Sequence, residues 1–129
     1  MALWAGVRDL TPFARIDGPV WRLSVPPARA SRIVAAISES ISCRWFYDWG
    51  GALIWLCVDP NLADGGARVV RAELAEDGHA FLLRASSDLR ARVETFQPLT
   101  PLLVNLTARV KRAFDPHGIL NTGCLAPRA

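Results

Sequence analysis

The chain has 129 residues, of which 51% are hydrophobic, and it carries a formal net charge of +3. This length is sufficient for one domain with a hydrophobic core, and the composition excludes an intrinsically disordered chain. The basic residues include a single lysine, Lys111, and are scattered along the sequence rather than gathered into a run. We therefore expect no nucleic-acid partner.

No apolar run approaches the ~18 residues of a membrane span, and the N-terminal residues lack the features of a secretory signal. The three cysteines, Cys43, Cys57 and Cys124, contain no C-x-x-C pair, and an odd number cannot close into a full set of internal disulfides. These features predict a cytoplasmic protein with reduced thiols and without a transmembrane segment.

Residues 1–19 are expected to form a leader that contains a short helix. After the leader, polar and apolar residues alternate over residues 20–25, which predicts a strand with Arg22 on the face opposite to Trp21 and Leu23. Spacing and turn residues predict the remaining elements: a helix over residues 28–40, strands over 43–49 and 52–58 joined by Gly50-Gly51, a helix containing Ala67, Val70 and Leu74, and a strand over 79–85.

The order strand, helix, strand, strand, helix, strand suits a ferredoxin-like α+β fold, in which an antiparallel sheet carries two helices on one face. A polar stretch leads to a C-terminal helix over residues 98–114 with a strongly apolar side, followed by a loop over residues 115–129. The loop starts with Asp115-Pro116-His117-Gly118, whose residue types suit a type I turn. We therefore expect one domain over residues 20–129.

The third predicted strand is apolar on both of its faces: Leu53, Trp55 and Cys57 lie on one, and Ile54, Leu56 and Val58 on the other. A sheet covered by helices on one face should be polar on the other, so both faces of this strand require cover. Either the leader or the last helix packs on the second face, or this face marks the place of a missing domain or partner subunit.

The segment 114–123 reads F-D-P-H-G-I-L-N-T-G. It resembles the terminal motif F-D-P-x-G-x-[LF]-N-P-G of FAD-linked oxidases of the vanillyl-alcohol oxidase superfamily. Three earlier segments, residues 21–26, 48–56 and 96–99, make the chain similar to the FAD-binding subunit of glycolate oxidases. The resemblance extends over about residues 20–127.

The resemblance implies an enzyme that oxidises a small 2-hydroxy acid such as glycolate by passing a hydride to FAD, within a complex of related subunits. In that family this region caps the reactive face of the flavin, and the terminal loop returns to the FAD-binding domain. The chain departs from the family at Thr122, where proline is usual, and at Cys124, where a basic residue is usual. It also lacks the glycine-rich loops that would hold the FAD pyrophosphate, so we expect the chain alone to be colourless and inactive.

A 2-hydroxy acid carries a carboxylate, which the planar fork of arginine binds with two parallel hydrogen bonds. We expect Arg22 and Arg84 to bind it, because the first and fourth strands of a ferredoxin-like sheet are neighbours and both side chains can project from the face opposite to the helices. Alternatively, each arginine pairs with an acid such as Asp48 or bonds backbone at the sheet edge. Trp49 is either a wall of the substrate pocket or a packing residue beside the hairpin turn.

The candidate cofactor contacts are Asn121 and His117. The family comparison places Asn121 near the flavin, where its amide can form a hydrogen bond, and His117 could contact the flavin or act as a base. Both residues equally suit roles in a turn. The chain contains only two histidines, far apart and in no metal-binding motif, so we expect no metal site and no catalytic triad.

Two other functions compete with the oxidase hypothesis. The same element order describes an RRM, which stacks RNA bases on rings of its third strand, but residues 51–57 keep only one ring, Trp55. Alternatively, the chain is a small-molecule-binding or interaction module without catalytic activity, which covers its exposed sheet face by forming a homodimer.

Overall fold

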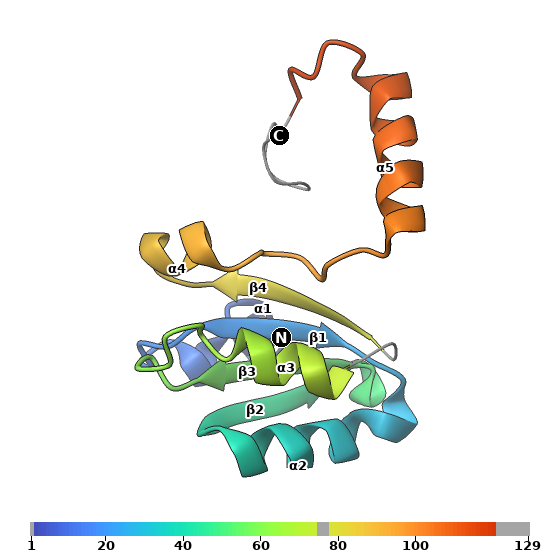
Figure 1. Ribbon diagram of the computed structural model, residues 1–129. Helices are drawn as coiled ribbons and strands as arrows, with labels where there is room; N and C mark the ends of the chain where they lie inside the picture. The colour runs from blue at the N-terminus through green and yellow to red at the C-terminus, as the bar shows by residue number, and fades with distance from the viewer. Residues whose placement is uncertain (1, 75–77, 121–129) are drawn as a thin grey trace. The chain divides into compact units, whose positions relative to one another are not determined.

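The computed structural model describes residues 2–74 and 78–120 (Figure 1). Two compact units are present, Met1–Gln97 and Pro98–Ala129. Among the described residues, no helix has both the length and the apolar character needed to cross a bilayer.

The first unit contains a four-stranded antiparallel sheet (Figure 1). Its strands are β1 (Val20–Ser24), β2 (Cys43–Asp48), β3 (Leu53–Val58) and β4 (His79–Arg84). They lie in the order β2-β3-β1-β4, so β1 and β3 are central and β2 and β4 form the two edges. With helices α2 (Ala30–Ser40) and α3 (Ala67–Leu74) between the strands, this is the predicted ferredoxin-like α+β arrangement.

One face of the sheet forms the main core with α2 and α3. The alternation of β1 was predicted correctly, since Trp21 and Leu23 are fully buried there while Arg22 is exposed on the other side. The helices contribute the apolar residues that recur at helical spacing: Ile33, Val34 and Ile37 from α2, and Val70 and Leu74 from α3.

Helices α2 and α5 begin two to three residues later than the sequence predicted, and the first unit contains two further short helices, α1 and α4. The C-terminal helix α5 spans Pro101–Phe114, because Pro101 suits the first helical turn and holds Thr100 in extended conformation. A 3₁₀ turn over Pro27–Arg29 precedes α2. The short helix α1 (Ala2–Arg8) lies in the leader as expected, whereas α4 (Ser87–Arg92) falls in the polar stretch, for which no element was predicted.

Helix α4 was missed because its apolar signal is short. Ser86 caps the helix by accepting a hydrogen bond from the N–H of Leu89 at 3.2 Å. Leu89 is the only residue of α4 that is buried. One buried position provides no helical periodicity to detect.

Trp21 connects three segments of the first unit on the helix-covered face. Its Nε1 donates to the buried carbonyl of Gly65, in the loop before α3, at 2.8 Å. The Arg71 guanidinium of α3 lies 5.6 Å from the centre of the indole ring. Arg71 also donates to the carbonyls of Glu94 and Phe96, so the segment after α4 is held through the same arginine.

We predict that Trp21→Phe lowers the free energy of unfolding by about 1–3 kcal/mol, because the buried Gly65 carbonyl loses its donor. Chemical denaturation measures this difference. Trp49→Phe is the matched control, since Trp49 is 78% exposed, and it should change stability by less than about 0.5 kcal/mol. Equal effects of the two substitutions would contradict the role assigned to Trp21.

The second unit consists of α5 and the loop that follows it. Leu103, Leu106 and Val110 lie on one side of α5 and are 43%, 51% and 51% exposed. The predicted amphipathic helix is therefore present.

Candidate functional site

The sheet face opposite to α2 and α3, called the far face below, is partly covered by the leader. Phe13 of the leader is buried together with Val20 and Cys57 of the central strands. The ring of Phe13 also lies 5.3 Å from that of Phe46 on β2. Of the alternatives left open for the second apolar face, the leader therefore provides cover at the end of the sheet near Cys57.

Arg84 fixes the leader to this face. A register shift between β1 and β4 places Arg84 opposite Val20, and opposed residues of an antiparallel pair share a face. The guanidinium donates to three leader carbonyls, those of Phe13, Ile16 and Gly18, with the shortest bond at 2.7 Å to Ile16. Backbone bonding at the sheet edge, one of the alternatives derived from the sequence, is thus what the structure shows for Arg84.

Arg22 lies on the part of the far face that remains open. It is exposed, and its neighbours across the sheet are Trp55 on β3 and Phe81 on β4. Arg22 and Arg84 do not converge on a common point, since the Arg84 guanidinium is held by carbonyls of the leader. Of these two predicted arginines, Arg22 is therefore the one available for an anionic ligand.

Trp49 stands at the tip of the β2–β3 hairpin. It has φ of 51° and is followed by Gly50 at 60° and Gly51 at 91°, so three successive residues are left-handed. Asp48 supports this turn by accepting from the Trp49 N–H at 2.8 Å. With 78% of its surface exposed, Trp49 does not have the packing role considered from the sequence. Its contact with a substrate stays a prediction.

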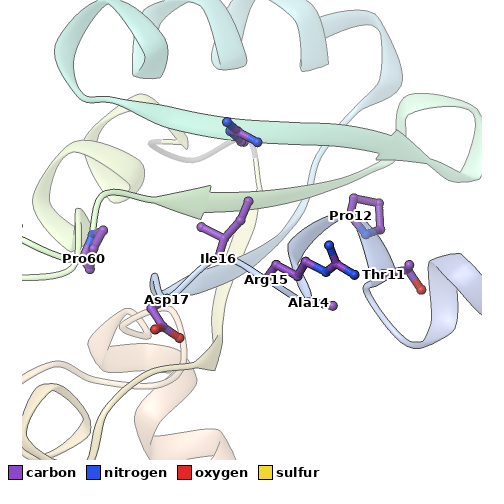
Figure 2. A pocket seen from close by; sticks show the side chains of 8 residues that line it. Thr11, Pro12, Ala14, Arg15, Ile16, Asp17 and Pro60 are labelled. Atoms are coloured by element: carbon purple, nitrogen blue, oxygen red, sulfur yellow. The ribbon is translucent and has the colours of Figure 1, made fainter.

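A hollow of about 600 Å³ lies between the leader and the end of β2 (Figure 2). Arg15 and Asp17 line it from the leader, and Arg44 lines it from β2. Neither Arg15 nor Arg44 was predicted from the sequence. Arg44 could have been found, because it stands between the apolar residues Cys43 and Trp45 along β2, as Arg22 stands between Trp21 and Leu23 along β1. Nothing in the leader sequence marks Arg15.

The loop at Gly65-Gly66 does not fit the pyrophosphate of FAD. A phosphate-binding loop requires glycines whose missing side chains leave room for the ligand. Gly65 and Gly66 have φ of 57° and 77°, but a Cβ on Gly65 would lie 2.5 Å from Leu89 and one on Gly66 would lie 3.0 Å from Ile41. These glycines allow protein packing instead of forming a cradle.

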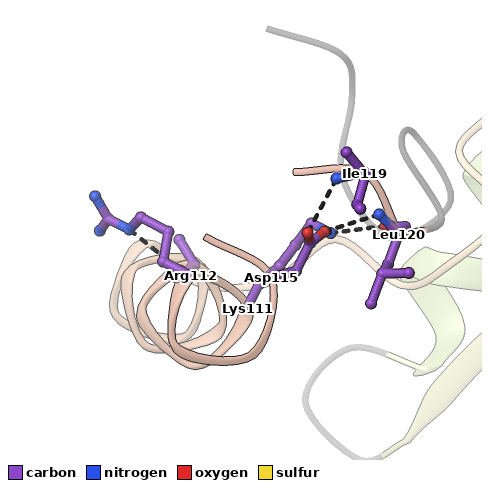
Figure 3. A network of polar contacts seen from close by, with 6 residues as sticks. Lys111, Arg112, Asp115, Ile119 and Leu120 are labelled. Carbon is purple, nitrogen blue, oxygen red and sulfur yellow. Dashed lines mark hydrogen bonds and ion pairs between the residues drawn. The ribbon is translucent and has the colours of Figure 1, made fainter. Parts of the chain in front are cut away.

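In the second unit, Asp115 organises the loop after α5 (Figure 3). The buried carboxylate accepts from the N–H groups of Ile119 and Leu120, both at 2.9 Å, and from Lys111 Nζ at 3.0 Å. Lys111 also donates to the Leu120 carbonyl at 2.9 Å. The Leu120 amide, with Lys111 and the Ile119 amide, holds the pKa of Asp115 below its ordinary value despite burial.

The turn expected at Asp115-Pro116-His117-Gly118 is closed by a bond from Gly118 N–H to the Asp115 carbonyl at 3.2 Å. His117 is exposed at this turn. Asn121, the other candidate cofactor contact, lies outside the described residues, as do Thr122 and Cys124. Flavin contact by His117 or Asn121 stays a prediction.

Cys43 and Cys57 are free thiols, and burial raises the pKa of each. A raised pKa lowers the thiolate fraction, so neither is suited to act as a nucleophile. Over residues 2–74 and 78–120, no group of three or more histidine, cysteine or acidic residues could hold a metal ion.

Comparison with known proteins supports the resemblance drawn from the terminal motif. The chain matches the glycolate oxidase subunit GlcE of Escherichia coli K12 at 28% identity over 121 residues. It is similar to a glycolate oxidase subunit. The match covers 93% of this chain and 30% of GlcE, so the chain spans less than a third of that relative's length. No protein-family model matches the chain, and no solved structure matches it significantly.

We predict that Arg84→Met loosens the leader and speeds alkylation of Cys57 about tenfold or more, because at least one charge-assisted hydrogen bond is lost. The rate is measured by mass spectrometry of the Cys57 peptide. Arg84 lowers the pKa of Cys57, so loss of its charge alone would reduce the thiolate fraction and slow alkylation. A faster rate in the variant therefore indicates that the leader has opened. Arg22→Met is the matched control and should leave the rate unchanged.

We also predict that the amide resonances of Ile119 and Leu120 titrate with Asp115, at a midpoint below the ordinary ~3.9 of an aspartate. Because the folded-state pKa is lowered, the loop is stabilised above the unfolded-state pKa and loses this stabilisation as pH falls through the folded-state pKa. NMR detects the titration. Asp115→Asn should abolish it and His117→Ala should not; a midpoint above that of an unfolded peptide would contradict the assignment.

Proposed function

We propose that this chain forms the substrate-side domain of an FAD-linked 2-hydroxy acid oxidase of the glycolate oxidase type, acting in the cytoplasm. The observation that carries this proposal is the similarity to GlcE along nearly the whole chain. The ferredoxin-like sheet and the helix that leads into the F-D-P-H-G loop agree with it.

In this proposal FAD is held by a domain outside these residues. The loop at Gly65-Gly66 is filled by Leu89 and Ile41, so it offers no room for a pyrophosphate. FAD would supply hydride acceptance, and this chain would bind and orient the substrate and exclude water. The other partners are the remaining subunits of the oxidase.

The far face is the surface we assign to the substrate. Arg22 offers a fork for the carboxylate of a 2-hydroxy acid, and the rings of Trp55 and Phe81 flank it across the sheet. Arg84 acts as a positioning residue, since it holds the leader against the same face. Arg15 and Arg44 form a weaker candidate because Asp17 lines the same hollow and offsets part of their charge.

The test is a chimeric oxidase in which this chain replaces the matching segment of Escherichia coli GlcE, co-produced with the other subunits of that enzyme. We expect the chimera to retain flavin absorbance and glycolate-dependent dye reduction, and the isolated chain to show neither. Flavin retained by the isolated, washed chain would contradict the proposal. So would a flavin-loaded chimera that binds its partners and does not oxidise any 2-hydroxy acid.

In the active chimera, Arg22→Met should raise KM for glycolate about 10- to 100-fold, as expected for the loss of a charge-assisted pair. Arg15→Met is the control for a change of charge beside the leader and should leave KM within about twofold. An unchanged KM in the Arg22 variant would remove Arg22 from the substrate site.

A further inference from the structure

The two edges of the sheet differ in how they are protected. The outer edge of β4 is partly covered, because Phe96 forms a bridge with Phe81 and the N–H of Leu82 donates to the Thr95 carbonyl at 2.8 Å. Within the described part of the chain, β2 pairs with β3 alone. Its outer row of backbone donors and acceptors therefore faces no strand.

Strand β2 also lacks three features that often prevent edge-to-edge pairing: a proline, a lysine and a β-bulge. Its six residues, C-R-W-F-Y-D, include no proline and no lysine, and its register with β3 is continuous, without a bulge. Two aromatic side chains on this edge remain partly uncovered, Trp45 at 41% and Tyr47 at 45% exposed. An exposed, regular, aromatic edge of this kind is a template for another strand.

We propose that the occupant is β2 of a second copy of this chain, paired antiparallel about a two-fold axis at Phe46. Phe46 then opposes Phe46 of the second copy, and the two sheets form one continuous sheet. Arg44 opposes Asp48 of the second copy, and Trp45 opposes Tyr47, each pair occurring twice by symmetry.

Side-chain direction selects this register. Arg44 and Asp48 lie on the far face, since they oppose Cys57 and Leu53 within the sheet, and Trp45 lies on the helix-covered face, opposite Leu56. Opposed residues of an antiparallel pair must share a face, and these pairs do. A slip of two residues keeps the faces but places Arg44 opposite Phe46 or Gly50, depending on its direction, so both ion pairs are lost.

The interface is small, since it consists of one short strand from each copy. Cross-strand ion pairs and aromatic pairs each contribute modestly, so we expect a dimer with a dissociation constant in the micromolar range rather than an obligate assembly. The backbone pairing uses the β2 edge, and β3 separates β2 from Arg22 on β1. The interface is therefore distinct from the substrate surface around Arg22 and differs from a homodimer formed face to face.

The test follows the mass of the full chain by sedimentation equilibrium over a range of concentrations. The wild-type chain should approach twice its 14.1 kDa mass. Arg44→Asp places like charges opposite each other at two positions, as does Asp48→Arg, so each variant alone should dissociate at least about tenfold more readily. Mixing the two variants should restore the dimer, because both charge pairs are complementary in the heterodimer.

Asp48 also supports the hairpin turn, so replacing it could disturb folding as well as dimerisation. Recovery of the dimer on mixing would exclude this explanation, because a misfolded variant could not pair. Circular dichroism confirms that each separate variant is folded. Arg68→Asp, an equal change of charge on α3, should leave the dimer intact. Hydrogen exchange should show protection of residues 43–48 that increases with concentration.

Three results would overturn the proposal. The wild-type chain could be monomeric at every concentration. The dimer could dissociate with Arg22→Asp and not with Arg44→Asp, which would indicate pairing through the far face. The mixture of Arg44→Asp and Asp48→Arg could remain as monomeric as either folded variant alone.

Discussion

The apolar character of both faces of the central strands constrains the rest of this structure. On β3, Ile54 and Leu56 require cover on one side and Cys57 on the other. The helices α2 and α3 can cover only one face, so the leader packs against the second. Phe13 of the leader is therefore part of the core, and the far face is divided into a covered end near Cys57 and an open part around Arg22.

Two arginines fix the segments that lie on these faces. Arg71 donates to carbonyls after α4 while stacking on Trp21, and Arg84 donates to carbonyls of the leader. A guanidinium has five donors and no acceptor, so it can join several carbonyls of an irregular segment at once. Arg22 belongs to the same sheet but opposes Trp55 and Phe81, and this difference in surroundings makes it the better candidate for a substrate carboxylate.

The functional proposal rests on the relation to GlcE, and the structure narrows what this chain can contribute to such an enzyme. The space beside Gly65 and Gly66 is occupied by Leu89 and Ile41, so this loop offers no room for a phosphate group. The loop after α5 is ordered by a buried carboxylate that is itself part of the F-D-P-H-G motif, Asp115. This gives a physical reason for the aspartate in the motif: its backbone carbonyl closes the turn, and its two carboxylate oxygens accept from the amides of Ile119 and Leu120.

The sequence by itself determined the elements with strong periodicity or turn residues: the four strands, α2, α3, the hairpin at Gly50-Gly51 and the Asp115 turn. These depend on local chemistry, which short windows contain. The tertiary structure decided how the elements use their side chains. Whether Arg84 is free depends on a register shift beside Val20 and on carbonyls far away in the chain, and neither leaves a local signal. Long-range packing likewise decided where the leader lies, that the edge of β2 stays open, and that Arg15 and Arg44 line one hollow. None of these features leaves a local signal in the sequence.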